Sequence, residues 1–216
     1  GLVGSEMCIR DRWLADGVNR MALGCVMNSM WDCWAKIEKK PLWKKNITTL
    51  RKSYENYRIP KVFKNRSNPG VAIKDISDIV SNNTIVTAGA GNHTHFVLRH
   101  HVFKKLNTLL APINAPMGYS VPSSIAAAII NRDKEVICYA GDGCFMMNFQ
   151  EIVIAVARNL KITFIIFNNG IYGSIRMHQE LKYPGKSIAT DLNNPNFLAL
   201  ANSFGIKAVS YTHLRA

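Results

Sequence analysis

Two short stretches of the chain combine residue types that could bind a phosphate group and a divalent cation. The first is Gly141-Asp142-Gly143, and the second, Asn168-Asn169, follows after 24 intervening residues. Two glycines permit a tight turn whose backbone N–H groups can approach a phosphate, and Asp142 would repel that phosphate unless a cation lay between them. A carboxylate and a neutral amide oxygen are typical Mg²⁺ ligands. Because Gly-Asp-Gly alone also fits a plain turn, the hypothesis of a magnesium–phosphate site depends on the second stretch.

Each stretch follows a short apolar run that predicts a buried strand. These runs are Glu135–Ala140 and Lys161–Phe167, and the segment Phe149–Asn159 between them predicts a helix. One strand–helix–strand unit brings the two turns side by side at the carboxyl edge of a parallel sheet, where such folds bind ligands. A third strand is predicted over Thr84–Ala88, before Gly89-Ala90-Gly91. Further helices are predicted over Val71–Val80, Pro122–Asn131, Ile171–Leu181 and Pro195–Phe204. The expected fold class is therefore α/β, a parallel sheet with helices on both faces.

Several motifs in the same order resemble those of the thiamin-diphosphate-dependent enzymes of the acetolactate synthase and pyruvate decarboxylase superfamily. Gly141 to Asn169 resembles the family's cofactor motif, G-D-G-x24-N-N. Four further stretches resemble family motifs: Thr87–His93, Met117–Pro122, Met146–Glu151 and Tyr172–Arg176. The resemblance covers residues 71–208 and implies the family's thiamin-diphosphate-binding fold, with the diphosphate-binding domain expected over residues 67–208.

The resemblance also implies roles for individual residues. Asp142 and Asn169 would hold Mg²⁺ by their side chains, and Ile171 would hold it by its carbonyl. Met117 would support the bent cofactor, and backbone groups at Ala115 and Met117 would hold its pyrimidine. The other implied cofactor contacts are Asn92, His93, Gly141, Gly143 and Cys144, beside Asn169 and Ile171. Two of these residues have purely structural alternatives, Met117 as core packing and His93 as a buried structural histidine.

This sequence departs from the family pattern at several positions. Asn92 replaces the common Gln, Ala115 stands where Gly is usual, and Cys144 replaces Ser or Ala. His178 occupies the position at which acetolactate synthases have a Trp that shapes the pocket for the second keto acid. Ile175 occupies the position of a carboxylate found in some decarboxylases. A 2-keto acid decarboxylase or another carboligase therefore stays an alternative to acetolactate synthase-like chemistry.

No catalytic residue is identified on this chain. In the family, the glutamate that activates the cofactor lies in a separate N-terminal pyrimidine domain, and the active site forms between two subunits. We expect this chain to be a fragment that supplies the diphosphate and Mg²⁺ half of the site and is inactive alone. The parent would be a homodimer or homotetramer that decarboxylates a 2-keto acid and passes the product to an acceptor. Whether the parent also uses FAD is not readable from these residues.

The two ends of the chain lack the hydrophobic periodicity of the segments next to them. Residues 1–12 and 209–216 resemble peptides that arise when sequencing-adapter DNA is translated, and we expect both to be artefacts. Residues 13–66 are interpreted as the remnant of a middle domain plus a linker. Within them, apolar spacing over residues 18–40 predicts an amphipathic helix, and the basic stretch 41–70 is interpreted as a surface connector.

The composition excludes some function classes and leaves one distant alternative. The chain has 27 Lys and Arg against 14 Asp and Glu, a net charge of +13, and eleven of the basic residues lie between positions 36 and 66. Charge alone would fit a nucleic-acid-binding module, but no motif of one is present, and we expect no nucleic-acid partner. A Rossmann dinucleotide site would need G-x-G-x-x-G, and Gly89-Ala90-Gly91 does not continue that way. No apolar run reaches the ~18 residues of a membrane span, so no membrane partner is expected.

The cysteines indicate the redox setting of the chain, and three histidines lie outside the recognised motifs. The five cysteines are odd in number and contain no C-x-x-C pair, which argues against a disulfide framework or a zinc site and favours a reducing, cytoplasmic setting. Cys138 lies in an apolar run and is predicted to be a core residue. His95, His100 and His101 match no motif and are interpreted as lying on a helix surface or behind the site.

Overall fold

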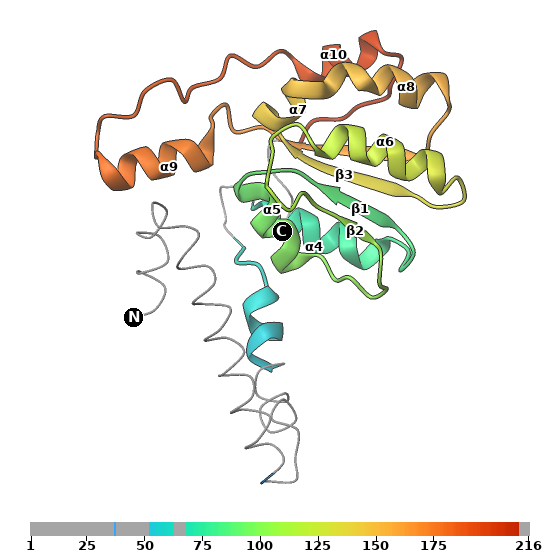
Figure 1. The fold of residues 1–216 in the computed structure, drawn as a ribbon, viewed down its shortest axis with the longest axis horizontal. Coiled ribbons are helices and arrows are strands. Elements are labelled where there is room, and N and C mark those ends of the chain that lie inside the picture. Colours follow the sequence, from blue (N-terminus) through green and yellow to red (C-terminus); the bar gives the residue numbers. More distant parts are fainter. Residues whose placement is uncertain (1–36, 38–51, 63–67, 212–216) are drawn as a thin grey trace. The chain divides into compact units, whose positions relative to one another are not determined.

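The computed structural model describes residues 37, 52–62 and 68–211 (Figure 1). The chain divides into two compact units, Gly1–Tyr57 and Arg58–Ala216. Residues 52–58 are helical and mostly exposed, so the basic stretch interpreted as a surface connector contains a helical segment that its charge pattern did not reveal. Apart from residue 37, which is helical, the helix predicted over 18–40 lies outside the described residues, as do the N-terminal artefact and most of the C-terminal one. The domain limits drawn from the sequence stay predictions.

A four-stranded parallel sheet forms the centre of the second unit. Its strands are β1 (Ile85–Ala88), β2 (Leu109–Leu110), β3 (Val136–Gly141) and β4 (Ile162–Phe167), in the order β2-β1-β3-β4. The register places Val136 opposite Ile162 and Gly141 opposite Phe167. The carboxyl ends of β3 and β4 are therefore level with each other, and the residues that follow them emerge at the same edge.

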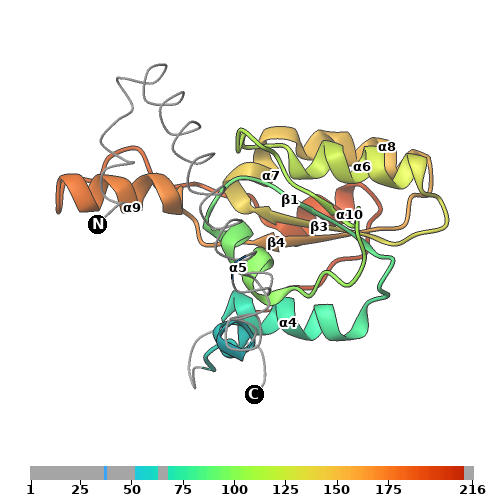
Figure 2. The same cartoon turned by 60° about the horizontal axis from the view of Figure 1, so that its bottom comes forward.

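Helices cover both faces of the sheet (Figure 2). One face packs against α6 (Ser120–Ile130), α7 (Asp142–Asn148) and α8 (Ile152–Ala157), with α10 (Phe197–Ser203) at its margin. The other face packs against α4 (Pro69–Ile79) and α5 (Asn92–His100). Because both faces are covered, strand residues are buried whichever face of the sheet they point to. All of β1 and nearly all of β3 are buried. Cys138 of β3 is fully buried in this core, as predicted.

The sequence predicted most of these elements within a few residues of their observed bounds. The helix predicted over Phe149–Asn159 consists of a short 3₁₀ turn, η2 (Phe149–Glu151), followed by α8, and the helix predicted at Ile171 begins two residues later as α9 (Gly173–Lys182). The prediction missed α5, α7 and β2. Histidines and a threonine give α5 a weak intrinsic helix propensity, and β2 has only two residues, so neither leaves a clear periodic pattern. No described helix is of a length and apolarity that would let it cross a membrane.

The histidines at the end of α5 are core residues, which corrects the sequence interpretation of two of them. His95 is exposed on the helix, as expected. His100 and His101 are only 3% and 5% exposed. The His100 Nδ1 atom lies 2.6 Å from the Arg58 carbonyl oxygen. The His101 ring packs against Phe103, with ring centroids 4.7 Å apart. The polar character of these residues misled the prediction, because the end of α5 lies against the apolar face of the sheet.

Acidification should destabilise this unit through His101. Burial, aided by the nearby Arg58 charge, lowers the pKa of His101 from 6.5 to about 4. Below about pH 6.5 the unfolded chain binds a proton at this residue that the native chain does not bind until about pH 4, so stability is lost as the pH falls through that window. In urea unfolding followed by circular dichroism, His101→Gln should show a smaller loss of unfolding free energy between pH 7 and pH 5 than the wild type. An equal loss would contradict this assignment.

The α4 helix offers a matched pair of substitutions for the core. Ile73 is fully buried against β1 and β3, whereas Ile79, on the same helix, is 82% exposed. Ile73→Ala should cost about 2–5 kcal/mol of unfolding free energy, because it removes buried methyl groups and leaves a cavity. Ile79→Ala should change the unfolding free energy by less than about 0.5 kcal/mol. Urea titrations of both variants test the packing, and similar losses in the two would show that α4 does not pack as described.

Candidate functional site

The two polar turns predicted to be neighbours are joined by a hydrogen bond. Asp142 follows β3 directly, begins α7 and is only 3% exposed. Its Oδ2 atom accepts a hydrogen bond of 2.7 Å from the backbone N–H of Gly170, in the turn after β4. Its Oδ1 atom accepts one of 2.9 Å from the N–H of Gly143. The level ends of β3 and β4 therefore bring Gly-Asp-Gly and Asn-Asn-Gly together, as the sequence predicted.

A later segment folds back over these turns. We call residues Thr190–Asn194 the strap. The N–H of Tyr172 donates to the Thr190 carbonyl, and the N–H of Leu192 donates to the Gly170 carbonyl, both at 2.8 Å. Ile171 and Asp191 form an antiparallel bridge between these two bonds. In such a pair the N–H and carbonyl of the central residue face away from the partner strand. The Ile171 carbonyl is thus directed away from the strap and is available to a ligand.

Asn194, the last residue of the strap, was not among the predicted site residues. Its Nδ2 atom donates to Asp142 Oδ2 at 2.7 Å and to Asn168 Oδ1 at 2.9 Å. The only sequence signal was a polar Asn-Asn-Pro-Asn run before the helix that became α10. That run predicts a turn and a helix cap, and it carries no information about a return to the Gly-Asp-Gly turn.

The oxygen atoms that meet here suit a hard cation. Asp142 offers a buried carboxylate, and Ile171 offers a carbonyl. Asn169 is exposed, and its Oδ1 atom accepts a 3.2 Å hydrogen bond from the N–H of Ile171, which folds the side chain over the same turn. Among the described residues, no group of three or more His, Cys, Asp or Glu side chains could hold a metal ion. A donor set of one carboxylate with amide and carbonyl oxygens fits Mg²⁺ completed by water and phosphate, rather than zinc.

His93 has unused hydrogen-bonding capacity beside these turns. A Cβ atom at either Gly91 or Gly141 would lie 3.0 Å from the His93 Nδ1 atom, a tight contact, so the two glycines give this ring room. The Nε2 atom is buried and has no hydrogen-bond partner among the described residues. Burial lowers the pKa of His93 to about 4 despite the opposing charge of Asp142, so the ring is neutral at pH 7. A neutral imidazole with one nitrogen that has no hydrogen-bond partner can form a hydrogen bond with a polar ligand.

The remaining predicted contacts at the strand ends hold the turns together. Cys144 is buried, and its Sγ atom donates to the Ala90 carbonyl at 2.8 Å. Burial raises the pKa of Cys144, so it is a neutral thiol rather than a nucleophile. Asn92 is exposed and accepts a 3.1 Å hydrogen bond from the Ser174 hydroxyl. A Cβ atom at Gly143 would lie 2.6 Å from the Tyr172 ring, so this glycine makes room for that ring.

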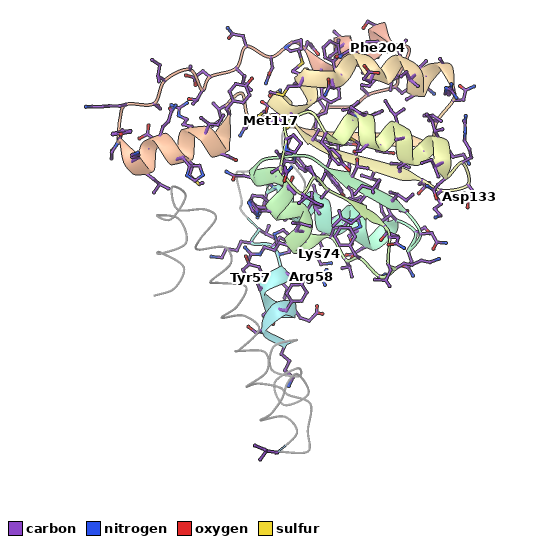
Figure 3. All side chains as sticks on the ribbon, viewed as in Figure 1. Tyr57, Arg58, Lys74, Met117, Asp133 and Phe204 are labelled. Carbon is purple, nitrogen blue, oxygen red and sulfur yellow. The ribbon has the colours of Figure 1, made fainter. Side chains whose placement is uncertain are left out.

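The loop that contains Ala115 and Met117 lies at the same end of the unit. Asn148, at the end of α7, donates from Nδ2 to the Gly118 carbonyl at 3.0 Å. Figure 3 shows Met117 at the opposite end of the sheet from Asp133. Met117 is half-buried, and Ala115 is exposed with a φ of 46°. That φ lies in the left-handed region, which favours glycine.

His178 and Ile175, which depart from the pattern of the resembling family, lie on α9. His178 and Ile175 are both exposed, and α9 has no buried residue. Arg176 of α9 forms a 2.8 Å ion pair with Asp191 of the strap, and Gln179 exchanges hydrogen bonds with the backbone of Ile188.

Comparison with known proteins identifies relatives of this chain. Residues 89–215 match the sequence profile described as "Thiamine pyrophosphate enzyme, C-terminal TPP binding domain". The chain is 30% identical over 167 residues to the acetolactate synthase isozyme 1 large subunit of Escherichia coli, covering 76% of this chain and 29% of that protein. It is 34% identical over 150 residues to the acetolactate synthase large subunit of Corynebacterium glutamicum, covering 67% and 24%. The chain thus spans less than a third of the length of these curated relatives.

A solved structure confirms the fold class. The thiamine diphosphate-dependent 4-hydroxybenzoylformate decarboxylase of Rhodococcus jostii RHA1 superposes with a TM-score of 0.66 at 17% sequence identity, covering 72% of this chain and 30% of that one. The predicted parallel α/β fold with helices on both faces is therefore the one observed.

The left-handed backbone at Ala115 predicts a stabilising substitution. A residue with a Cβ atom costs about 1–2 kcal/mol in this region, whereas glycine costs about 0.5–1 kcal/mol in lost chain entropy. Ala115→Gly should therefore raise the unfolding free energy by up to about 1 kcal/mol. Ala111→Gly, in the same loop and without a positive φ, should lower it. Thermal unfolding of the two variants provides the measurement, and a loss of stability in Ala115→Gly would contradict the assigned conformation.

Proposed function

The chain belongs to the thiamine pyrophosphate enzymes through their C-terminal TPP binding domain, and from that membership we propose that it forms the diphosphate- and Mg²⁺-binding half of an active site for 2-keto acids. The observation that carries the proposal is the 2.7 Å hydrogen bond between Asp142 and Gly170. It joins two turns whose oxygen atoms suit a magnesium ion, at the carboxyl edge of the sheet where α/β folds bind ligands.

The chain's own residues would bind and orient the cofactor. Mg²⁺ would be held by the Asp142 carboxylate, the Asn169 side chain and the Ile171 carbonyl. The His93 ring, whose Nε2 atom has no hydrogen-bond partner among the described residues, would face the diphosphate together with Asn92 and the backbone near Cys144. Bound thiamin diphosphate supplies the electron sink that decarboxylation of a 2-keto acid requires. The residues described here would position the cofactor and supply the negative charge that binds Mg²⁺.

The reaction proposed for the parent enzyme is acetolactate synthase-like decarboxylation followed by carboligation. This follows the names of the relatives, which are acetolactate synthase large subunits. The exposed His178 on α9 favours a second candidate, a 2-keto acid decarboxylase or another carboligase, because the resembling acetolactate synthases have Trp at this position. Both candidates use the same diphosphate half, so the choice between them does not affect the roles proposed for Asp142 and Asn169.

The proposal includes further partners of this half-site. The activating glutamate would come from a pyrimidine domain, and the parent would be a homodimer or homotetramer. The isolated chain would bind the cofactor weakly and turn over no 2-keto acid. The coverage of less than a third of the relatives' length supports this view. The free, buried thiols of Cys138 and Cys144 favour a reducing compartment such as the cytoplasm.

Removal of the Asp142 charge should abolish Mg²⁺-dependent binding of thiamin diphosphate. Asp142→Asn keeps the acceptor toward Gly170 and Asn194, loses the one toward Gly143, and removes the only carboxylate of the proposed site. Asn169→Ala removes a neutral ligand and should weaken binding less. Calorimetric titration of thiamin diphosphate with and without Mg²⁺ measures both effects.

Asp133→Asn is the matched control for this titration. Asp133 is an exposed aspartate at the opposite end of the sheet (Figure 3), so its removal should leave the affinity unchanged. The metal assignment is wrong if Asp142→Asn binds thiamin diphosphate and Mg²⁺ as tightly as the wild type.

A further inference from the structure

The carboxamide of Asn194 occupies one oxygen of the Asp142 carboxylate. The Asp142 Oδ2 atom accepts two hydrogen bonds of 2.7 Å, one from the backbone of Gly170 and one from Asn194 Nδ2. The Oδ1 atom accepts one bond, of 2.9 Å, from the N–H of Gly143. A carboxylate oxygen has two acceptor positions. Oδ2 is therefore saturated, and Oδ1 keeps one position for a cation.

The orientation of the Asn194 amide is fixed from both of its hydrogens. Nδ2 has two N–H groups, and each has an acceptor, Asp142 Oδ2 at 2.7 Å and Asn168 Oδ1 at 2.9 Å. The strap that carries Asn194 is itself anchored by the two backbone bonds to Gly170 and Tyr172 and by the ion pair between Asp191 and Arg176. The amide donor thus reaches the carboxylate from a segment held independently of the Gly-Asp-Gly turn.

We infer that Asn194 is a positioning residue that locks the Asp142 carboxylate so that Oδ1 faces the metal; this inference rests on the metal site proposed above. Without Asn194, Oδ2 would keep only the Gly170 bond, each oxygen would then have one open acceptor position, and the cation would no longer be directed to Oδ1. Groups that hydrogen-bond to a metal-ligating carboxylate typically alter metal affinity by 10- to 100-fold when they are removed.

The test is a titration of Mn²⁺ in the presence of thiamin diphosphate, followed by electron paramagnetic resonance of the full chain. Asn194→Ala should weaken Mn²⁺ binding by about 10- to 100-fold. It should also change the spectrum of the bound ion, because the carboxylate is no longer held in one orientation. Asn194→Leu fills nearly the same space without a donor and should weaken binding to the same degree, so the result does not depend on a single variant.

Asn196→Ala provides the matched control in the same segment. The Asn196 side chain accepts hydrogen bonds from the N–H groups of Leu198 and Ala199 and so caps α10, without contact to Asp142. Its removal should lower the thermal stability but leave the Mn²⁺ affinity and spectrum unchanged. Wild-type affinity in Asn194→Ala, or an equal loss in Asn196→Ala, would overturn the positioning role.

The same titration distinguishes failure of this inference from failure of the proposed function. If the wild-type chain does not bind Mn²⁺ and thiamin diphosphate, or if Asp142→Asn binds them equally well, the metal site itself is wrong and the inference fails with it. If the wild type binds, Asp142→Asn does not and Asn194→Ala binds normally, the metal site stands and only the role of Asn194 is refuted.

Discussion

A buried negative charge, the carboxylate of Asp142, is the constraint around which the carboxyl edge of the sheet is organised. The side chain is only 3% exposed, and an uncompensated buried carboxylate is very costly. Its hydrogen-bond donors are the N–H groups of Gly143 and Gly170 and the amide of Asn194, all of them neutral. Asp142 takes part in neither the Lys74–Asp78 nor the Arg176–Asp191 ion pair. The charge is solvated by dipoles but not cancelled, which is the state expected of a ligand for a divalent cation.

The hydrogen-bond donors to Asp142 come from three separate parts of the chain, at Gly143, Gly170 and Asn194. The register of β3 and β4 sets Gly141 opposite Phe167, so the turns that follow them meet without a long loop. The strap then returns from beyond α9 and adds a two-bond antiparallel pairing to the second turn. Glycine at position 143 is required for this closure, because a Cβ atom there would meet both the Tyr172 ring and the Leu192 side chain. Dense packing around the carboxylate excludes water, and this makes each fixed dipole more effective.

The sequence could predict those parts of the site that depend on local pattern. Apolar runs followed by glycine-rich turns predicted β3, β4 and their neighbouring ends, because a parallel strand–helix–strand unit has few possible arrangements. The contact of Asn194 with Asp142 could not be predicted, since it depends on how 52 residues of intervening chain return to the sheet. The burial of His100 and His101 was missed for a related reason. Their polarity favours the surface, and only the docking of α5 against α4 and β3 buries them.

The protonation states at the site restrict what these residues can do chemically. A general acid or base works best with a pKa near the working pH. Burial holds the pKa of His93 at about 4 and raises that of Cys144, so both are neutral at pH 7 and neither is suited to exchange a proton there. Asp142 is committed to three hydrogen bonds. The strand-end turns can therefore hold an anion and a cation in fixed positions but have no group tuned for proton transfer, and a reaction that begins with removal of a proton needs its base from outside these turns.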